Sequence, residues 1–219
     1  MTKEMQALLD DFTTLGNIAL EMLRLASDAY FSGDPEPANQ VLNLEKQLNR
    51  KEVEMEEKCQ SVLTIYKLDA YSVRLALSIL KATVDLERVG DFCFKMAKRA
   101  LERLKPLQHP QADSLKKLSR VSSSMLYDAF QSFIQQDQML ARNVGPQDPE
   151  ADNLKNLIIS EIRSRCKQAT CTDQDLEILQ TAQDLERIAD HATNIAEETL
   201  VLPTGSVQRH TIRSERERL

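Results

Sequence analysis

The heptapeptide DLERVGD at residues 85–91 returns almost unchanged as DLERIAD at residues 184–190. Its Glu and second Asp recur at one offset, since 186 − 87 = 99 and 190 − 91 = 99. An apolar seam recurs at the same offset, in steps that alternate between four and three residues, the spacing of a helix face buried in a bundle. The seam consists of Ile79, Thr83, Leu86, Gly90, Cys93, Ala97 and Ala100, then of Ile178, Ala182, Leu185, Ala189, Ala192, Ala196 and Thr199. The duplication predicts two similar helical units.

Turn signals divide the chain into six helical segments. With 5 Gly, no Trp and 5% aromatic residues, the composition favours helices over sheets, which need many turns. The predicted helices span residues 4–31, 37–62, 69–105, 112–140, 149–167 and 173–202, with SGDPEP and NVGPQDPE as loops. We expect an all-α protein of two tandem three-helix bundles related by a pseudo-twofold axis. The first repeat is residues 1–107, the second is 108–203, and residues 204–219 are a charged, flexible tail.

Charge and hydropathy exclude several classes of protein. A net charge of −6 and a pI near 5.2 argue against nucleic-acid binding, which needs a clustered basic surface. The start, MTKEMQALLDDF, carries acids where a secretory signal has apolar residues, and no apolar run is long enough to span a membrane. We therefore expect a cytoplasmic protein, with Cys59, Cys93, Cys166 and Cys171 as reduced thiols.

The heptad itself holds two kinds of charge pair. Asp85 and Arg88 stand three apart, as do the equivalent residues 184 and 187, and we expect each pair to attract along its helix. Glu87 and Asp91, four apart, place like charges on one helix face, which destabilises a helix by about 0.2–0.5 kcal/mol. Repetition of this unfavourable pair beside the same seam suggests a cation between the carboxylates, because carboxylate oxygens are ligands for Mg, Ca, Mn or iron.

Two other helices offer further ligands at the same four-residue spacing. Glu45 and Asn49 lie in the second predicted helix, and Asp148 and Asp152 lie near the start of the fifth. If these helices run antiparallel to the heptad helices, two equivalent surface sites result. Acid pairs such as Glu52 with Glu56 show the same spacing and are interpreted as solvated faces.

No motif for common catalytic chemistry is present. The sequence contains no ExxH pair, Gly-rich phosphate loop, GxSxG or HExxH, so di-iron, nucleotide, esterase and zinc-protease chemistry lack support. His191 follows the second heptad outside the seam and is expected to be a surface or interface residue.

The heptads and their flanks resemble the PhoU family, the phosphate transport system accessory proteins. DLERVGDFCFKMA and DLERIADHATNIAEE resemble the family's paired ERIGD helices. MLYDAF at 125–130 resembles the start of its second repeat, and TGSVQRH at 204–210 resembles its closing segment. The resemblance covers nearly the whole chain and implies two three-helix bundles with pseudo-twofold symmetry.

The resemblance also implies a function without catalytic residues. Members regulate the phosphate-starvation response negatively and limit phosphate uptake, as adaptors between the ATPase subunit of the phosphate ABC transporter and a membrane sensor histidine kinase. We therefore expect peripheral association with membrane complexes. Some members bind iron or another divalent metal, such as Mg, Mn or Zn, through E/DxxxD motifs. These motifs fall on Glu87, Asp91, Glu186, Asp190, Asp148 and Asp152, with Glu45 as a weaker first-half counterpart.

Two departures from the family pattern affect these expectations. Asn49 replaces an acid and contributes no charge, so the first-half site should hold metal less tightly. Ala189 replaces the second Gly of ERIGD and adds a methyl group at the seam. A helical surface rich in small residues is expected to form a homodimer. Two alternatives stay open: a metal-binding or metal-storing protein, and a PhoU-like regulator of a different transporter.

Overall fold

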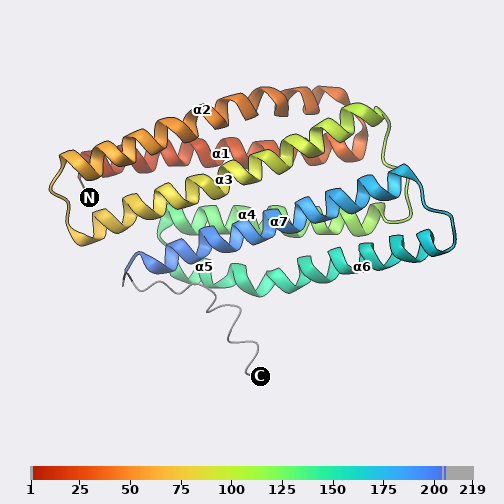
Figure 1. Cartoon of the computed structure of the whole chain (residues 1–219). Coiled ribbons are helices and arrows are strands. Elements are labelled where there is room, and N and C mark those ends of the chain that lie inside the picture. Colours follow the sequence, from red (N-terminus) through yellow and green to blue (C-terminus); the bar gives the residue numbers. More distant parts are fainter. Residues whose placement is uncertain (1, 204, 206–219) are drawn as a thin grey trace, which may run out of the picture.

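The computed structural model describes residues 2–203 and residue 205, which form helices joined by short turns (Figure 1). The helices are α1 (Lys3–Ser32), α2 (Pro35–Ile65), α3 (Ala70–Arg103), α4 (Ala112–Gln135), α5 (Gln138–Val144), the 3-10 helix η1 (Gly145–Gln147), α6 (Asp148–Lys167) and α7 (Asp173–Val201). The described part of the chain contains no strand, and the all-α prediction is confirmed. Except for Gly205, the predicted tail at 204–219 lies outside the described residues.

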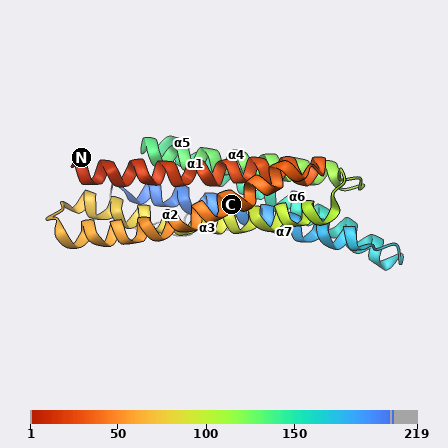
Figure 2. The ribbon, with the colours of Figure 1, turned by 90° about the horizontal axis from the view of Figure 1, so that it is seen from above.

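Two bundles lie side by side in an elongated body, α1 to α3 in one and α4 to α7 in the other (Figures 1 and 2). In each bundle the heptad helix packs against the other helices: α3 against α1 and α2, and α7 against α4 and α6. Contact between α3 and α7, with a smaller contact between α1 and α4, joins the bundles. No helix in the described residues is both long enough and apolar enough to cross a membrane.

The ends of the helices follow from local chemistry. Gly33 adopts φ 72°, which favours glycine, and ends α1. Asp34 then accepts a hydrogen bond from the backbone N–H of Glu36, 2.9 Å away, with Pro35 in the first turn of α2. The third helix was predicted to start at residue 69, and Asp69 caps α3 with its carboxylate 2.7 Å from the backbone nitrogen of Ser72. Because α1 ends at Ser32 and α2 begins at Pro35, the turn between these two helices is shorter than the predicted SGDPEP loop.

Outside α3 and α7, residues of the second repeat correspond to residues 103 positions earlier in the first repeat. The buried residues of α2 recur in α5 and α6, and the start of α5 matches the start of α2, since 138 − 35 = 103. Ala38, Val41, Leu48, Met55 and Cys59 correspond to Ala141, Val144, Ala151, Ile158 and Ile162. Together, α5, η1 and α6 are thus the counterpart of the single helix α2.

The prediction that NVGPQDPE forms a loop is wrong, as is the predicted end of the fourth helix at 140. The helix α4 ends at Gln135, and the segment is helical throughout, passing from α5 through η1 into α6. Pro146 stands where α2 has Asn43 (146 − 43 = 103). Since proline lacks an N–H and clashes with the preceding turn, the helix tightens to 3-10 geometry instead of stopping.

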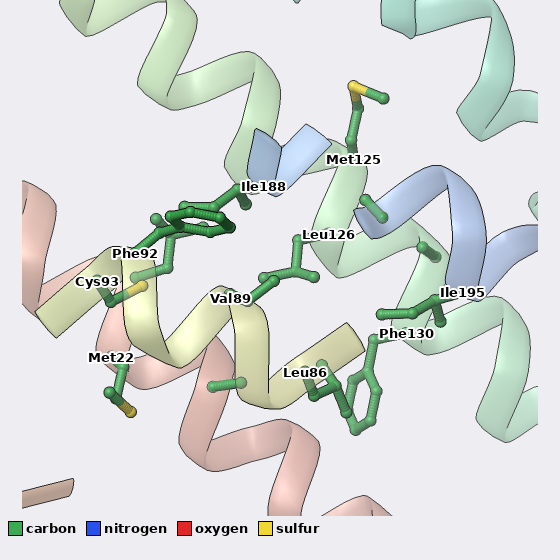
Figure 3. Packing of buried hydrophobic residues seen from close by; sticks show 14 of the residues in the cluster. Met22, Leu86, Val89, Phe92, Cys93, Met125, Leu126, Phe130, Ile188 and Ile195 are labelled. Carbon is green, nitrogen blue, oxygen red and sulfur yellow. The ribbon is translucent and has the colours of Figure 1, made fainter. Parts of the chain in front are cut away.

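One continuous hydrophobic core runs through both repeats. All fourteen seam residues predicted from the sequence are buried, including the free thiol of Cys93. Figure 3 shows Val89 of α3 pointing toward Leu126 of α4, so side chains of the two bundles meet directly. Phe12 of α1 packs against Phe133 of α4, with ring centroids 4.9 Å apart.

The prediction of four reduced cysteines is wrong for one pair. Cys166 and Cys171 form a disulfide across the turn between α6 and α7. The chain reverses there through Ala169, whose φ of 57° closes the turn and brings the two cysteines together. Beside this turn the buried carboxylate of Asp175 accepts a hydrogen bond from Arg165 at 2.7 Å and lies 3.0 Å from His109 of the connector between the repeats.

A pair of contacts shows the pseudo-twofold relation between α1 and α4. A Cβ added at Gly16 of α1 would overlap the ring of Phe130 in α4. The equivalent contact joins Ser119 and Ser27, because 119 − 16 and 130 − 27 both equal 103. There the two hydroxyl oxygens lie 3.0 Å apart. Glycine is therefore required at position 16, where α1 approaches Phe130 closely, but not at the equivalent position 119.

We predict that Gly16→Ala destabilises the protein, although alanine favours a helix by about 1 kcal/mol. Overlap with the Phe130 ring should lower the free energy of unfolding by about 1–3 kcal/mol, measured by urea denaturation. Adding Phe130→Leu should recover part of the loss, and Ser119→Ala serves as the control at the equivalent position. A Gly16→Ala protein as stable as the wild type would contradict the close contact.

Candidate functional site

The first Asp of each heptad connects the two repeats. His191 Nδ1 lies 2.7 Å from Asp85 Oδ1, so α7 contacts α3 through this pair. Asp184 accepts a hydrogen bond of 2.6 Å from Arg99 of α3. The predicted pairing of these aspartates with the arginine three residues later is therefore wrong, because each carboxylate points to the neighbouring repeat. His191 is an interface residue, as expected.

Between α3 and α7 runs a groove of about 610 Å³ that both heptads line. Asp91 and Asp190 lie on its walls, together with Arg187. The guanidinium of Arg187 and the ammonium of Lys95 both lie over the ring of Phe92, which forms part of the lining. The second Asp of each heptad thus faces the boundary between repeats, whereas the Glu interacts within its own repeat.

The first cluster comprises Glu45, Glu52, Glu87 and Asp91 of α2 and α3. Burial raises the pKa of Glu87, and repulsion from Asp91 raises it further, against the attraction of Arg88. Glu52 and Glu45 of α2 add smaller repulsions to the pKa of Glu87. As the sequence predicted, α2 brings carboxylates toward Glu87. Glu52, interpreted from the sequence as part of a solvated face, is partly buried and close enough to Glu87 to repel it.

Nearby cations neutralise the carboxylates of the first cluster only in part. The nearest cation is Arg88, whose nitrogens lie 3.6 Å from Glu87 and 3.7 Å from Asp91, beyond hydrogen-bond distance. Asn49 donates its amide to Glu45 at 2.7 Å and brings no charge. The cluster thus keeps an excess of negative charge on neighbouring faces of α2 and α3, and its carboxyl oxygens are hard ligands suited to a divalent cation.

The second cluster comprises Asp148 and Asp152 of α6 and Glu186 of α7, and it contains a lysine; Asp190, at the end of the same motif, lines the groove between α3 and α7. The ammonium of Lys155 donates hydrogen bonds to Asp152 Oδ1 at 2.8 Å and to Glu186 Oε1 at 2.6 Å, so it joins the two helices. Burial lowers the pKa of Lys155, but these hydrogen bonds outweigh it and the net shift is upward. Asp148 and Asp190 also form interactions of their own.

The two clusters correspond residue by residue but differ in charge at two positions: neutral Asn49 matches Asp152, and Glu52 matches Lys155. Asp148, Asp152 and Lys155 stand 103 residues after Glu45, Asn49 and Glu52, and Glu186 stands 99 after Glu87. Across the part of the chain that the structure describes, no group of three or more His, Cys, Asp or Glu side chains is positioned to hold a metal ion. A metal at the first cluster would therefore have to draw its carboxylates together.

A spacing of four residues does not connect Glu52 or Lys155 with the candidate ligands. Glu52 lies seven residues after Glu45 and Lys155 lies seven after Asp148, which is two helical turns and the same face. A search for charges at seven-residue spacing in the second and fifth predicted helices finds both.

We predict opposite effects of removing the heptad glutamate from the two repeats. The pKa of Glu87 is raised above its unfolded value, so ionisation of Glu87 destabilises the folded state. This destabilisation is absent below about pH 4.3, where the side chain is protonated in both states, and is complete above the folded-state pKa. Glu87→Gln should raise the free energy of unfolding at pH 7 by about 0.2–0.5 kcal/mol, and this gain should vanish on acidification.

The matched variant Glu186→Gln should lower the free energy of unfolding at pH 7 by about 1 kcal/mol, because Lys155 loses a charged partner. Urea denaturation of both variants at pH 7 and pH 4 measures the contrast. Shifts of equal sign in the two variants at pH 7 would contradict the difference between the clusters.

Comparison with protein families matches this chain to one domain twice. The family model described as PhoU domain matches residues 12–100 and again residues 115–199. These two segments contain the two heptads and all residues of both clusters, so the duplication read from the sequence is the duplication of that domain.

Named relatives cover the chain almost end to end. It is 28% identical over 209 residues to the phosphate-specific transport system accessory protein PhoU homolog of Pseudomonas aeruginosa, covering 94% of this chain and 86% of the relative. It is 27% identical over 217 residues to the phosphate-specific transport system accessory protein PhoU of Escherichia coli, covering 99% of this chain and 90% of the relative.

Solved structures agree with these sequence relatives. The crystal structure of PhoU from Pseudomonas aeruginosa matches with a TM-score of 0.87 at 27% identity, over 93% of this chain and 98% of that one. The phosphate transport system regulatory protein PhoU from Streptococcus pneumoniae matches with a TM-score of 0.84 at 28% identity, over 93% and 97%. The similarity therefore extends to the arrangement of both bundles.

Proposed function

The chain belongs to the PhoU family, and from that premise we propose that it is an accessory protein of phosphate transport that represses the phosphate-starvation response while phosphate is plentiful. It acts in this proposal as an adaptor between the ATPase subunit of the phosphate ABC transporter and a sensor histidine kinase, and so limits phosphate uptake. The observation that carries the proposal is the match of both repeats to the PhoU domain, together with relatives named for phosphate-specific transport.

The elongated shape of the fold supports an adaptor role. The body is elongated and built from long helices (Figure 2), so it presents extended helical faces on which two partners can bind at once. We propose that it works in the cytoplasm, as a homodimer, in peripheral contact with the membrane complexes. No catalytic residues are assigned, since the family is one of accessory proteins.

We also propose that the first cluster binds a divalent cation, iron or Mg, Mn or Zn. Its support is chemical: hard oxygen ligands on two helices, a raised pKa at Glu87 and no ion pair shorter than 3.6 Å from Arg88 to the cluster. A divalent cation would remove the repulsion between these carboxylates. The described residues contain no preassembled group of three or more ligands, so a cation at the first cluster would have to draw the carboxylates together, and a metal-storing protein has no observation of its own that favours it.

The regulatory proposal predicts the behaviour of a deletion strain grown with ample phosphate. Expression from a phosphate-starvation promoter should rise strongly when this chain is deleted, because the kinase is no longer restrained, and should return to the repressed level on complementation with wild type. The double variant Glu87→Ala/Asp91→Ala tests whether the first cluster is needed.

The control is the substitution Ser119→Ala, which lies far in sequence from both clusters. Low expression in the deletion strain would contradict regulation of this response and favour a regulator of a different transporter. Full repression by the double variant would show that repression does not require a cation at the first cluster.

A further inference from the structure

We propose that Lys155 is the built-in cation of the second cluster, so that only the first of the two acidic clusters is open to a divalent metal. The inference deepens the proposed metal binding and rests on it. It reverses the expectation from the sequence, in which Asn49 makes the first-half site the weaker one.

The position of the Lys155 ammonium is that of a shared cation. It bridges one carboxylate of α6 and one of α7, at 2.8 Å and 2.6 Å, so it already occupies the place between the helices where a metal would bind. The side chains of Lys155 and Glu186 are only 17% and 19% exposed. A divalent ion could enter only by displacing a lysine that is held from both sides and largely covered.

The equivalent position in the first repeat carries the opposite charge. Glu52 replaces the lysine there, since 155 − 52 = 103, and it repels Glu87 instead of neutralising it. Both residues are half-buried on corresponding faces of their helices. One substitution thus changes a cluster that contains its own cation into one that requires a cation from solution.

Electrostatics determines which cluster attracts a metal. A resident ammonium a few ångströms away repels a divalent ion, and it also occupies the carboxylate oxygens that would be ligands. Asn49 affects the first cluster less, because its amide donates to Glu45 and leaves Glu87 and Asp91 available. The loss of one acidic ligand is a smaller change than the presence of an opposing charge.

A reciprocal charge exchange tests the inference in the full-length protein. Mn²⁺ is titrated into chelator-treated protein, and the free aquo ion is followed by electron paramagnetic resonance. Glu52→Lys should weaken Mn²⁺ binding at the first cluster by at least about tenfold. Lys155→Glu should leave that binding intact and add a second class of Mn²⁺ site.

Three further variants keep the result interpretable. Lys155→Ala opens the second cluster without adding a ligand and replaces Lys155→Glu if the latter does not fold, as judged by circular dichroism. Asp152→Asn/Glu186→Gln, made in the protein that retains Lys155, should leave Mn²⁺ affinity unchanged, whereas Glu87→Gln/Asp91→Asn should abolish it.

The outcomes separate this inference from the proposal on which it rests. Folded Lys155→Glu and Lys155→Ala proteins that gain no Mn²⁺ site would overturn the role of Lys155, as would loss of wild-type binding in the Asp152→Asn/Glu186→Gln variant. Wild-type protein that binds no Mn²⁺ would contradict metal binding at the first cluster, and a gain of binding in Lys155→Glu would still support Lys155 as the resident cation.

Discussion

Close packing of α3 against α7 is the constraint on which the rest of the structure depends. The seam of each heptad helix faces its own bundle, as Gly90 does toward Leu48 of α2 and Met22 of α1. The face that α3 turns to α7 is more polar and includes Ser78, whose hydroxyl donates to Glu198 of α7 at 2.8 Å. The first Asp of each heptad then binds across the boundary, Asp85 to His191 and Asp184 to Arg99. With α3 and α7 held in this way, each heptad Glu is directed to the neighbouring helix of its own repeat.

Much of the fold could be predicted from the sequence, because a recurring seam at a fixed offset is a local, periodic signal. That signal predicts α3, α7 and their buried faces, and Asp69 marks the start of α3. The division of the counterpart of α2 into α5, η1 and α6 was not predictable from the presence of Pro146, since proline ends some helices and only distorts others. The disulfide between Cys166 and Cys171 depends on a turn that no periodicity reports.

The candidate site was predictable only in part. The sequence identifies Glu87 and Glu186 as equivalent, since they belong to one repeated motif, and it places further acids on the preceding helices. It does not show how differently the two are opposed: Glu87 has only its sequence neighbour Arg88 near it, whereas Glu186 is bonded by Lys155 from another helix. Partners distant in sequence, such as Asp85 and His191, likewise follow from packing and not from spacing.

The two repeats therefore share a backbone plan but differ in charge. Where the register places Glu52 in one copy and Lys155 in the other, one acidic surface keeps an excess of negative charge and the other contains its own cation. We propose that only the first of them binds a metal. The most direct test is anomalous diffraction from crystals of the full chain soaked with Mn²⁺. The account predicts a peak between α2 and α3 beside Glu87, with Lys155 still bridging Asp152 and Glu186. A peak between α6 and α7, with Lys155 displaced, would contradict it.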